Sequence, residues 1–413
     1  MKPLHTTIQQ SAIALLAFTV CAQAQAQRRT PELGEGPWDI DTETGTIHVS
    51  VLTRDTESPW SLVFLPDGDM LLAERSGRLR VIRNGELDPT PIDGLPEMAV
   101  VSISGLFGLA LHPDFEDNRL IYFAYPKIHP DDEELLSLAV ARAHWDGGPA
   151  LADVEDIFVA IDWYSAAMSA ENDRCCGQGP ASGSFGARID FDGEGYLYVT
   201  SGDRNWGEKA QDPGSHLGKI MRLNDDGSIP DDNPFVGMEG YLPELYTIGH
   251  RNQTGLRFDP ETGRLWSTEF GPRGGDELNL IEAGKNYGWL LVSQGEHYDG
   301  AENALGSIGI EGYVDPVISW PPSGNPGNVM VYRGDLFPDW QRNVFVAAMS
   351  RPGALVRVTL DSDGNATAEE RMLTELGQRM RDVVEGPDGR IYVLTEASAF
   401  ASPGAILVLA PGN

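Results

Sequence analysis

One phrase recurs along the chain and limits its fold more than any other feature. It is a loop built on Pro-Asp, Asp-Gly or Asp-Pro, followed by a short run of β-branched, aromatic and leucine residues. Asp and Gly accept the backbone angles of tight turns, so each copy predicts a turn that leads into a short strand. Six copies occur, at residues 65–73, 112–123, 191–199, 258–266, 337–346 and 386–393.

The spacing of the copies predicts the fold class. Their aspartates are separated by 47, 78, 67, 80 and 49 residues, which is room for one four-stranded antiparallel sheet per copy. Six such sheets around an axis make an all-β, six-bladed β-propeller, whereas a stack of β-sandwiches would need Pro/Ser linkers that this sequence does not show. Strands at 46–52 and 405–410 are expected to share one blade and close the ring. A ligand site is expected where the loops of all blades meet at the channel mouth.

The N-terminus has the pattern of an export signal. Lys2 precedes an apolar run over residues 11–22, and Ala24-Gln-Ala26 follows as a small-residue cleavage site. We therefore expect a signal peptide over 1–26, an N-terminal extension over 27–45 and a single propeller domain over 46–413. A buried N-terminal helix is the alternative, but Gln27-Arg28-Arg29 continues a helix poorly. The protein is expected to be periplasmic or secreted.

Removal of the signal would leave two cysteines, which are adjacent. In an oxidising compartment Cys175 and Cys176 could form a vicinal disulfide, although neighbouring Cα atoms about 3.8 Å apart strain the ring. A pair of small buried thiols is the alternative, and both stay open.

The charge of the chain excludes several classes of partner. It has 30 Lys and Arg against 62 Asp and Glu, a formal net charge of −32. So negative a surface repels phosphate backbones and anionic lipid headgroups, which argues against binding to nucleic acids or to membrane surfaces. Membrane insertion is not expected either. The expected partners are a neutral small molecule or a cation.

Several ordered motifs resemble one known family. They include Gly105-Leu-Phe-Gly-Leu-Ala-Leu-His-Pro-Asp-Phe115, Gly249-His-Arg-Asn252, Glu269-Phe-Gly-Pro-Arg-Gly-Gly-Asp276 and Arg379-Met-Arg-Asp382. With further matches between about residues 58 and 396, the chain resembles the soluble glucose/sorbosone (aldose sugar) dehydrogenases that depend on pyrroloquinoline quinone (PQQ). That family has six-bladed propellers.

The resemblance implies a cofactor site. PQQ is a flat tricarboxylate quinone, and arginine forks match both oxygens of a carboxylate. Arg379 and Arg381 lie two residues apart, so they are expected on one side of a strand. The positions that the resemblance assigns to the cofactor are Arg251, Asn252, Arg379, Arg381, Arg351 and Ser323.

The resemblance also implies calcium. In the family, backbone carbonyls of a Gly-Pro pair hold the ion, and here that pair is Gly271-Pro272. Calcium prefers such hard oxygen ligands and would act as a Lewis acid on the quinone. The acidic stretch 224–233 also resembles a calcium loop, but it lacks the terminal glutamate and predicts a solvated turn.

The implied reaction oxidises an aldose at its anomeric carbon, with hydride passing to calcium-bound PQQ while a base takes the hydroxyl proton. Where the family has a catalytic histidine, this chain has Ser184. A serine hydroxyl cannot take a proton near pH 7 without a base of its own. We therefore expect Asp203, which matches the aspartate that orients the histidine, to act as the base directly or through water.

Other departures keep two alternatives open. Ile103 replaces an expected glutamine, Phe270 a polar residue, and Ser350 a lysine, with Arg351 beside it as a substitute. One alternative is a noncatalytic carbohydrate- or ligand-binding propeller that retains PQQ. The other is a calcium-dependent hydrolase of the lactonase type, which the motifs around Arg379 and Gly271 disfavour. The electron acceptor is not predicted, and Cys175-Cys176 is a further candidate for the cofactor pocket.

Overall fold

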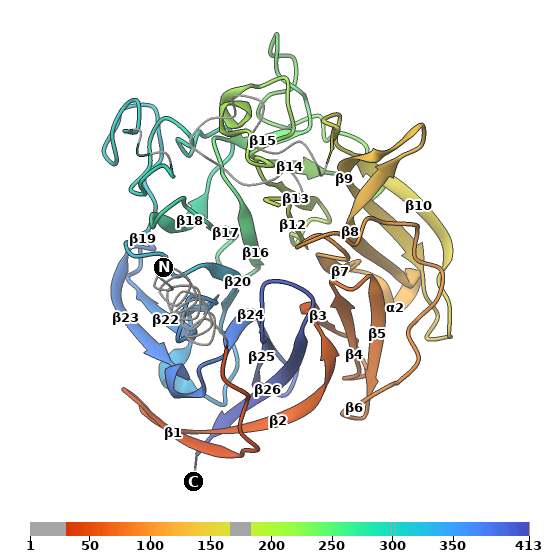
Figure 1. The fold of residues 1–413 in the computed structure, drawn as a ribbon, viewed down its shortest axis with the longest axis vertical. Helices are drawn as coiled ribbons and strands as arrows, with labels where there is room; N and C mark the ends of the chain where they lie inside the picture. Colours follow the sequence, from red (N-terminus) through yellow and green to blue (C-terminus); the bar gives the residue numbers. More distant parts are fainter. Residues whose placement is uncertain (1–29, 166–182, 299, 301, 413) are drawn as a thin grey trace, which may run out of the picture.

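The computed structural model describes residues 30–165, 183–298, 300 and 302–412. The expected signal peptide over 1–26 and the cysteine pair Cys175-Cys176 lie outside the described residues. Within the described part the strands form six sheets around a common axis (Figure 1). The predicted six-bladed, all-β propeller is confirmed.

Four of these six sheets have four antiparallel strands. The first consists of β3 (Pro59–Phe64), β4 (Met70–Glu74), β5 (Arg78–Arg83) and β6 (Glu86–Leu87). The others are β12 (Gly186–Phe191), β13 (Leu197–Ser201), β14 (Lys219–Leu223) and β15 (Leu245–Ile248); β16 (Gln253–Asp259), β17 (Arg264–Glu269), β18 (Asp276–Ile281) and β19 (Ile318–Trp320); and β20 (Pro326–Val331), β21 (Val344–Ala348), β22 (Ala354–Leu360) and β23 (Ala366–Met372).

The remaining two sheets each contain a fifth strand. One is built from β7 (Leu109–Leu111), β8 (Leu120–His129), β9 (Asp132–His144) and β10 (Ala152–Val159), with β11 (Tyr164–Ser165) also pairing with β9. The other is built from β24 (Arg379–Glu385), β25 (Ile391–Glu396), β26 (Pro403–Pro411), β2 (Gly45–Glu57) and β1 (Trp38–Thr42).

The ring is closed by strands from the two ends of the chain. As expected, β2 pairs with β26, with Val49 opposite Leu409 (Figure 1). Strand β1 pairs with β2 on the outer edge and falls inside the region expected as an extension over 27–45. The closing sheet therefore includes residues that precede position 46.

The recurring phrase forms turns for the expected reason. Asp192 Oδ1 accepts hydrogen bonds from the backbone N–H groups of Glu194 at 2.8 Å and Tyr196 at 2.9 Å. Gly195 in the same turn has a φ of +90°, a conformation that a residue with a Cβ rarely adopts. These local bonds satisfy the backbone at the point where β12 ends and β13 begins.

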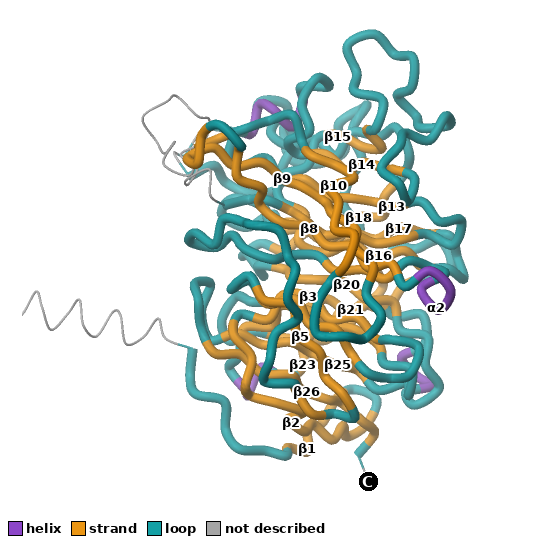
Figure 2. Tube along the Cα trace, turned by 90° about the vertical axis from the view of Figure 1, so that its right-hand side faces the viewer, coloured by secondary structure: helices purple, strands orange, loops and turns teal. Residues whose placement is uncertain are grey.

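Helices contribute little to the described part of the chain, as the side view in Figure 2 shows. They are α2 (Phe115–Asn118) and the 3₁₀ turns Gly207–Gln211, Pro338–Trp340 and Thr374–Leu376. No helix among the described residues has the length and apolar character needed to span a bilayer.

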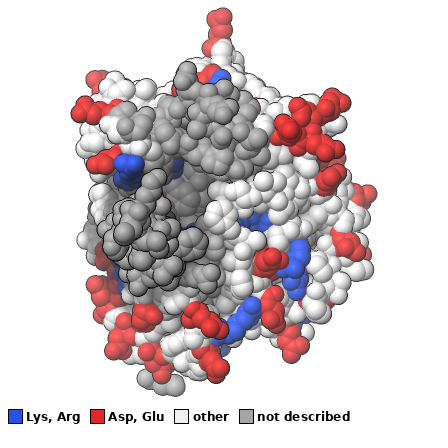
Figure 3. All heavy atoms as spheres, in the orientation of Figure 1, with Lys and Arg blue, Asp and Glu red and all other residues white. Residues whose placement is uncertain are grey.

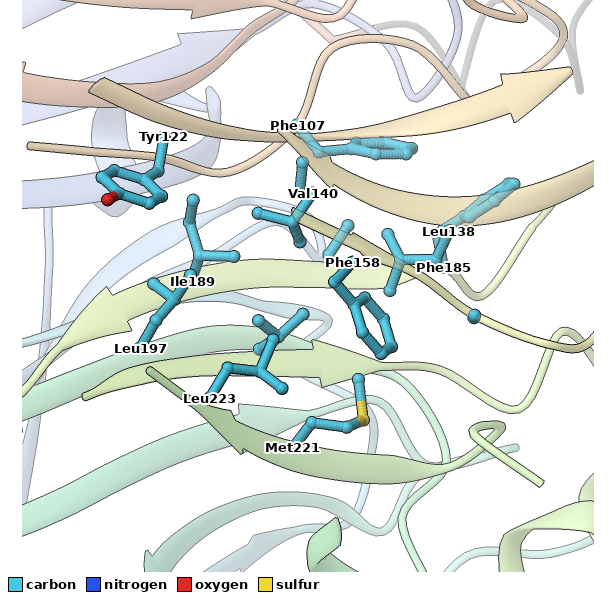
Figure 4. Close-up of a cluster of buried hydrophobic side chains, with 14 of the residues drawn as sticks. Phe107, Tyr122, Leu138, Val140, Phe158, Phe185, Ile189, Leu197, Met221 and Leu223 are labelled. Atoms are coloured by element: carbon cyan, nitrogen blue, oxygen red, sulfur yellow. The ribbon is translucent and has the colours of Figure 1, made fainter. Parts of the chain in front are cut away.

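The core lies between neighbouring blades. Figure 4 shows the cluster between the β7–β10 sheet and the β12–β15 sheet, to which Phe107, Val140, Phe185 and Met221 contribute. Burial of each such side chain is worth about 1.5–3 kcal/mol. This packing fixes the two blades against each other and holds Phe107 and Phe185 in place.

Polar side chains join the innermost strands of neighbouring blades. Asp382 Oδ2 on β24 accepts a hydrogen bond from the Leu62 N–H of β3 at 3.1 Å. Asn328 Oδ1 on β20 accepts one from the Leu256 N–H of β16, also at 3.1 Å. These bonds set the relative positions of the strands that surround the central channel.

Candidate functional site

The channel opens into a cavity at each mouth. The cavity at the end where the inner strands terminate has a volume of about 360 Å³. It is lined by many apolar side chains and by six charged ones: Arg188, Asp190, Arg257, Asp259, Arg333 and Glu385. Asp190 and Glu385 accept hydrogen bonds from the backbone N–H groups of Phe258 and Arg333, respectively, both at 2.7 Å. Because these acids already connect neighbouring blades, we assign this mouth a structural role.

The cavity at the opposite mouth differs in that its described lining includes arginines but no carboxylate. It has a volume of about 250 Å³ and lies where the inner strands β3, β12, β16, β20 and β24 begin. Aromatic and aliphatic side chains line one part of it, and three guanidinium groups line another. The described lining residues are Trp60, Arg75, Ile103, Phe107, Ser184, Phe185, Gly186, Asn252, Thr254, Phe270, Asn325, Arg379, Arg381 and Ala399.

Arg188, which lines the first cavity, forms a buried ion pair and also donates to two residues that line the second, Thr254 and Trp60. Arg188 Nη1 lies 3.4 Å from Asp382 Oδ2, and the same guanidinium donates to the carbonyl oxygens of Thr254 at 2.8 Å and Trp60 at 3.0 Å. Arg188 therefore binds to three other blades near the axis of the ring.

Three arginines converge on Glu396 at the second cavity. Glu396 Oε1 accepts hydrogen bonds from Arg381 Nη2 at 2.7 Å and from Arg379 Nη2 at 3.1 Å. Arg75 Nη2 lies 3.7 Å from Glu396 Oε2. Because Arg379 and Arg381 both face this cavity, the prediction that they lie on one side of a strand is confirmed.

The charges in this cluster do not balance. Burial alone would raise the pKa of Glu396, but Arg381, Arg379 and Arg75 together hold that pKa below its usual range. Burial, with the neighbouring Arg381, lowers the pKa of Arg75 to about 10. Two buried arginines and the partly buried Arg379 thus share one buried carboxylate, and this local surplus of positive charge favours an anionic ligand.

Aromatic rings form a wall beside the arginines. The Arg381 guanidinium lies 4.4 Å from the centre of the Trp60 ring. Trp60 contacts Phe107 edge-on with centroids 5.0 Å apart, and Phe107 lies 5.4 Å from Phe185. A flat aromatic molecule that carries carboxylates matches this combination of rings and cations.

The site stands out against the charge of the whole molecule. On the face shown in Figure 3, Asp and Glu side chains lie mostly around the outer edge, and Lys and Arg side chains are fewer. The arginine cluster supplies the local positive charge that a net charge of −32 opposes elsewhere.

Asn252 lines the cavity, and Arg251 does not belong to its described lining. Asn252 Oδ1 accepts a hydrogen bond from the Gly186 N–H at 3.0 Å. Arg251 Nη1 instead donates to the carbonyl oxygens of Phe270 at 3.1 Å and Gly271 at 2.9 Å. Asn252 thus lines the cavity, whereas the Arg251 guanidinium is bonded to two backbone carbonyls beside it.

The carbonyl groups expected to bind calcium already accept hydrogen bonds. Gly271 O faces the Arg251 guanidinium, and Pro272 O accepts from Tyr298 Oη at 3.1 Å. The neighbouring Asp276 carboxylate is engaged by the Gly271 N–H at 2.8 Å and by Ser323 Oγ at 2.6 Å. A divalent cation at Gly271 O would also meet the charge of Arg251. The residues in this arrangement therefore do not fit calcium.

Ser323 and Arg351 lie beside the cavity and are not among its described lining residues. Ser323 is bonded to Asp276, and Asn325, two residues further on, reaches the cavity. Asn325 Nδ2 donates to Ser350 Oγ at 2.8 Å, and the exposed Arg351 follows Ser350.

Ser184 lines the cavity, and Asp203 is buried behind it. Ser184 Oγ donates to Asn205 Oδ1 at 3.2 Å. Asp203 Oδ1 accepts from the Asn205 N–H at 2.9 Å, and Oδ2 accepts from Trp289 Nε1 at 2.8 Å. Burial raises the pKa of Asp203. None of the described lining residues is a histidine, aspartate or glutamate.

Sequence reasoning missed Arg75, Glu396, Trp60 and Asn325. Arg75 directly follows the buried strand β4, and Glu396 is the last residue of β25. A charged residue at the end of a buried strand was the available signal. It could not show that these two ends meet, because 321 positions separate Arg75 from Glu396 in the sequence.

Comparison with known proteins decides the family. A model described as "Glucose / Sorbosone dehydrogenase" matches residues 56–407. The chain belongs to this family. It is 36% identical over 371 residues to aldose sugar dehydrogenase YliI of Escherichia coli, covering 89% of this chain and 94% of that protein.

Solved structures place the fold in the same family. The apo form of the soluble aldose sugar dehydrogenase from Escherichia coli is 35% identical, with a TM-score of 0.79 over 89% of this chain and 100% of that one. The PQQ-bound form of aldose sugar dehydrogenase from Streptomyces coelicolor is 25% identical, with a TM-score of 0.68 over 88% and 98%. The resemblance drawn from the motifs is confirmed.

Proposed function

We propose that this family member is an exported quinoprotein that binds PQQ in the arginine-lined cavity and oxidises aldose sugars or related alcohols. One observation carries the proposal: three guanidinium groups share one buried carboxylate beside an aromatic wall, in a cavity of about 250 Å³. The PQQ-bound relative from Streptomyces coelicolor supports the same cofactor.

The chain's own residues would hold the cofactor from two sides. Arg379 and Arg381 would bind its carboxylates, Asn252 would offer an amide, and the Trp60 and Phe107 rings would exclude water. When bound, PQQ supplies a quinone that accepts a hydride from a C–H bond of the substrate. Orientation of the substrate and removal of its hydroxyl proton are left to the protein.

Removal of the proton from the substrate hydroxyl is the difficult step for this chain. The hydroxyl of Ser184 donates to Asn205, so its oxygen is left to accept a hydrogen bond from a substrate hydroxyl. The nearby base that we propose is Asp203, whose raised pKa suits a proton acceptor that works closer to neutrality. Its carboxylate is engaged by Trp289 and Asn205, so it would act through water.

A second candidate is a noncatalytic carbohydrate- or ligand-binding propeller that retains PQQ. It is favoured by the lack of an imidazole or carboxylate among the described lining residues. We assign calcium no role in either candidate function, because an ion at Gly271 and Pro272 would have to displace Arg251 and Tyr298 from the two carbonyl groups. The proposal that the protein is exported to the periplasm or the medium rests only on the sequence of residues 1–26.

The test is reconstitution of the purified protein with PQQ, with and without calcium, followed by dye reduction across a panel of aldoses and simple alcohols. Dye reduction with any aldose supports the dehydrogenase. Saturable PQQ binding without reduction by any substrate supports the binding protein, and no PQQ binding contradicts both.

A further inference from the structure

Two buried arginines outside the arginine-lined cavity, Arg188 and Arg80, donate to backbone carbonyl oxygens at short distances. Arg188 donates to the carbonyl oxygens of Thr254 at 2.8 Å and Trp60 at 3.0 Å. Arg80 donates to the carbonyl oxygen of Asp88 at 2.5 and 3.2 Å. These are ordinary hydrogen bonds of structural arginines.

Arg75 is equally buried, at 4% exposure, but its contacts are long. Its Nη1 lies 3.5 Å from Ile103 O, its Nη2 lies 3.4 Å from Phe400 O, and the ion pair with Glu396 spans 3.7 Å. A buried donor usually has a partner at 2.7–3.2 Å, so the protein satisfies this guanidinium poorly.

Two more atoms of the same cluster lack partners. Glu396 Oε2 and Arg381 Nε are buried and have no hydrogen-bond partner among the described residues. Arg75 lines the cavity between the Ile103 loop and the Ala399 loop, while Arg379 and Arg381 belong to β24. Cations thus face the cavity from two different blades.

We propose that Arg75 is a third ligand-binding arginine, which takes a second carboxylate of a planar aromatic polycarboxylate held by Arg379 and Arg381. The inference rests on the proposed function in naming PQQ as that ligand. A flat molecule with carboxylates on separate edges would be held from both blades, while its rings face the aromatic wall.

The experiment measures equilibrium binding of PQQ to the full-length mature chain by tryptophan fluorescence, without substrate or dye. Arg75→Gln is compared with wild type and with Arg80→Gln, a buried arginine on the same sheet that does not line the cavity. Loss of one charged hydrogen-bonding group predicts about 10- to 100-fold weaker binding for R75Q and less than about 3-fold for R80Q. Arg75→Lys, which keeps the charge without the fork, should fall between wild type and R75Q.

Salt dependence separates a direct contact from a structural effect. If Arg75 touches a carboxylate, R75Q should weaken the dependence of PQQ affinity on ionic strength, and R80Q should not. Circular dichroism confirms folding of each variant, and R75K replaces R75Q if R75Q does not fold. The proposal would be overturned if R75Q bound PQQ as tightly as wild type, or if R75Q and R80Q lost PQQ affinity equally. If R75Q does not fold, PQQ binding by R75K as tight as that of wild type would overturn it.

Failure of the cofactor assignment is distinguishable from failure of this inference. The same titrations are run with benzene-1,2,4-tricarboxylate, followed by the shift in melting temperature. If wild type binds the tricarboxylate but not PQQ, the proposed function fails, and the loss of binding in R75Q still supports the role of Arg75. If wild type binds neither, both fail.

Discussion

Arg381 Nη2 lies 2.7 Å from Glu396 Oε1, and both side chains are almost completely buried. Glu396 is the counter-ion of the arginine cluster, so Glu396→Gln should remove the carboxylate shared by buried Arg75 and Arg381 and partly buried Arg379. We expect a loss of about 3–5 kcal/mol in the free energy of unfolding at pH 7, measured by urea denaturation. Glu155→Gln, which breaks an exposed pair with Arg142, should cost less than about 1 kcal/mol.

The effect of Glu396→Gln should depend on pH in one direction. The pKa of Glu396 is lowered in the folded protein, so its contribution to stability is present above the ordinary glutamate pKa of about 4.3. That contribution is lost as the pH falls below this value through the folded pKa. The stability difference between wild type and E396Q should therefore shrink in acid, and a constant difference from pH 7 to pH 3 would contradict the assignment.

Ser184→His tests the proposal that this chain lacks the histidine that the resemblance expects at position 184. Ser184 lines the cavity and has a φ of +52°, a region that His and Asn enter more readily than most residues. If the missing base limits the reaction, Ser184→His should raise turnover with PQQ and an aldose by at least about 10-fold. Ser184→Asn is the matched control and should raise nothing; equal turnover in both variants would show that the base is not limiting.

Asp203→Asn tests the proposed base. We expect turnover to fall about 100-fold while PQQ affinity changes less than about 3-fold, because Asp203 does not line the cavity. A base works when deprotonated, so wild-type turnover should rise with pH through the raised pKa of Asp203, and this rise should disappear in the variant. Unchanged turnover would remove Asp203 from the mechanism.

The parts of the site that were predictable are those encoded within one short segment. Arg379 and Arg381 alternate along one strand, so their common side followed from strand geometry. Asn252 and Ser184 were predicted as site residues because they belong to short motifs, and each lies just before an inner strand. Arg75 and Glu396 were not predictable, because their contact depends on how two separate blades are arranged around the ring.

Arg251 and Gly271 show a second limit of sequence reasoning. The resemblance assigned Arg251 to the cofactor and Gly271 to calcium, but the sequence could not show that the guanidinium of one donates to the carbonyl of the other. Whether a calcium ion or the Arg251 side chain binds the carbonyl oxygen of Gly271 depends on their positions in the folded protein, which the sequence does not give.

Removal of calcium tests this arrangement. Because Gly271 O and Pro272 O already accept protein hydrogen bonds, a chelator should shift the melting temperature of the cofactor-free protein by less than about 1 °C. Magnesium-buffered chelation controls for the general effect of divalent ions. A loss of several degrees that calcium alone restores would show that an ion resides there.

The central claim is that the arginine-lined cavity holds PQQ, and direct titration tests it. We predict saturable binding of one PQQ per chain, at micromolar or tighter affinity, which weakens as salt is raised and is reduced at least about 10-fold in Arg381→Gln. Absence of saturable binding, or equal binding by wild type and Arg381→Gln, would contradict the account.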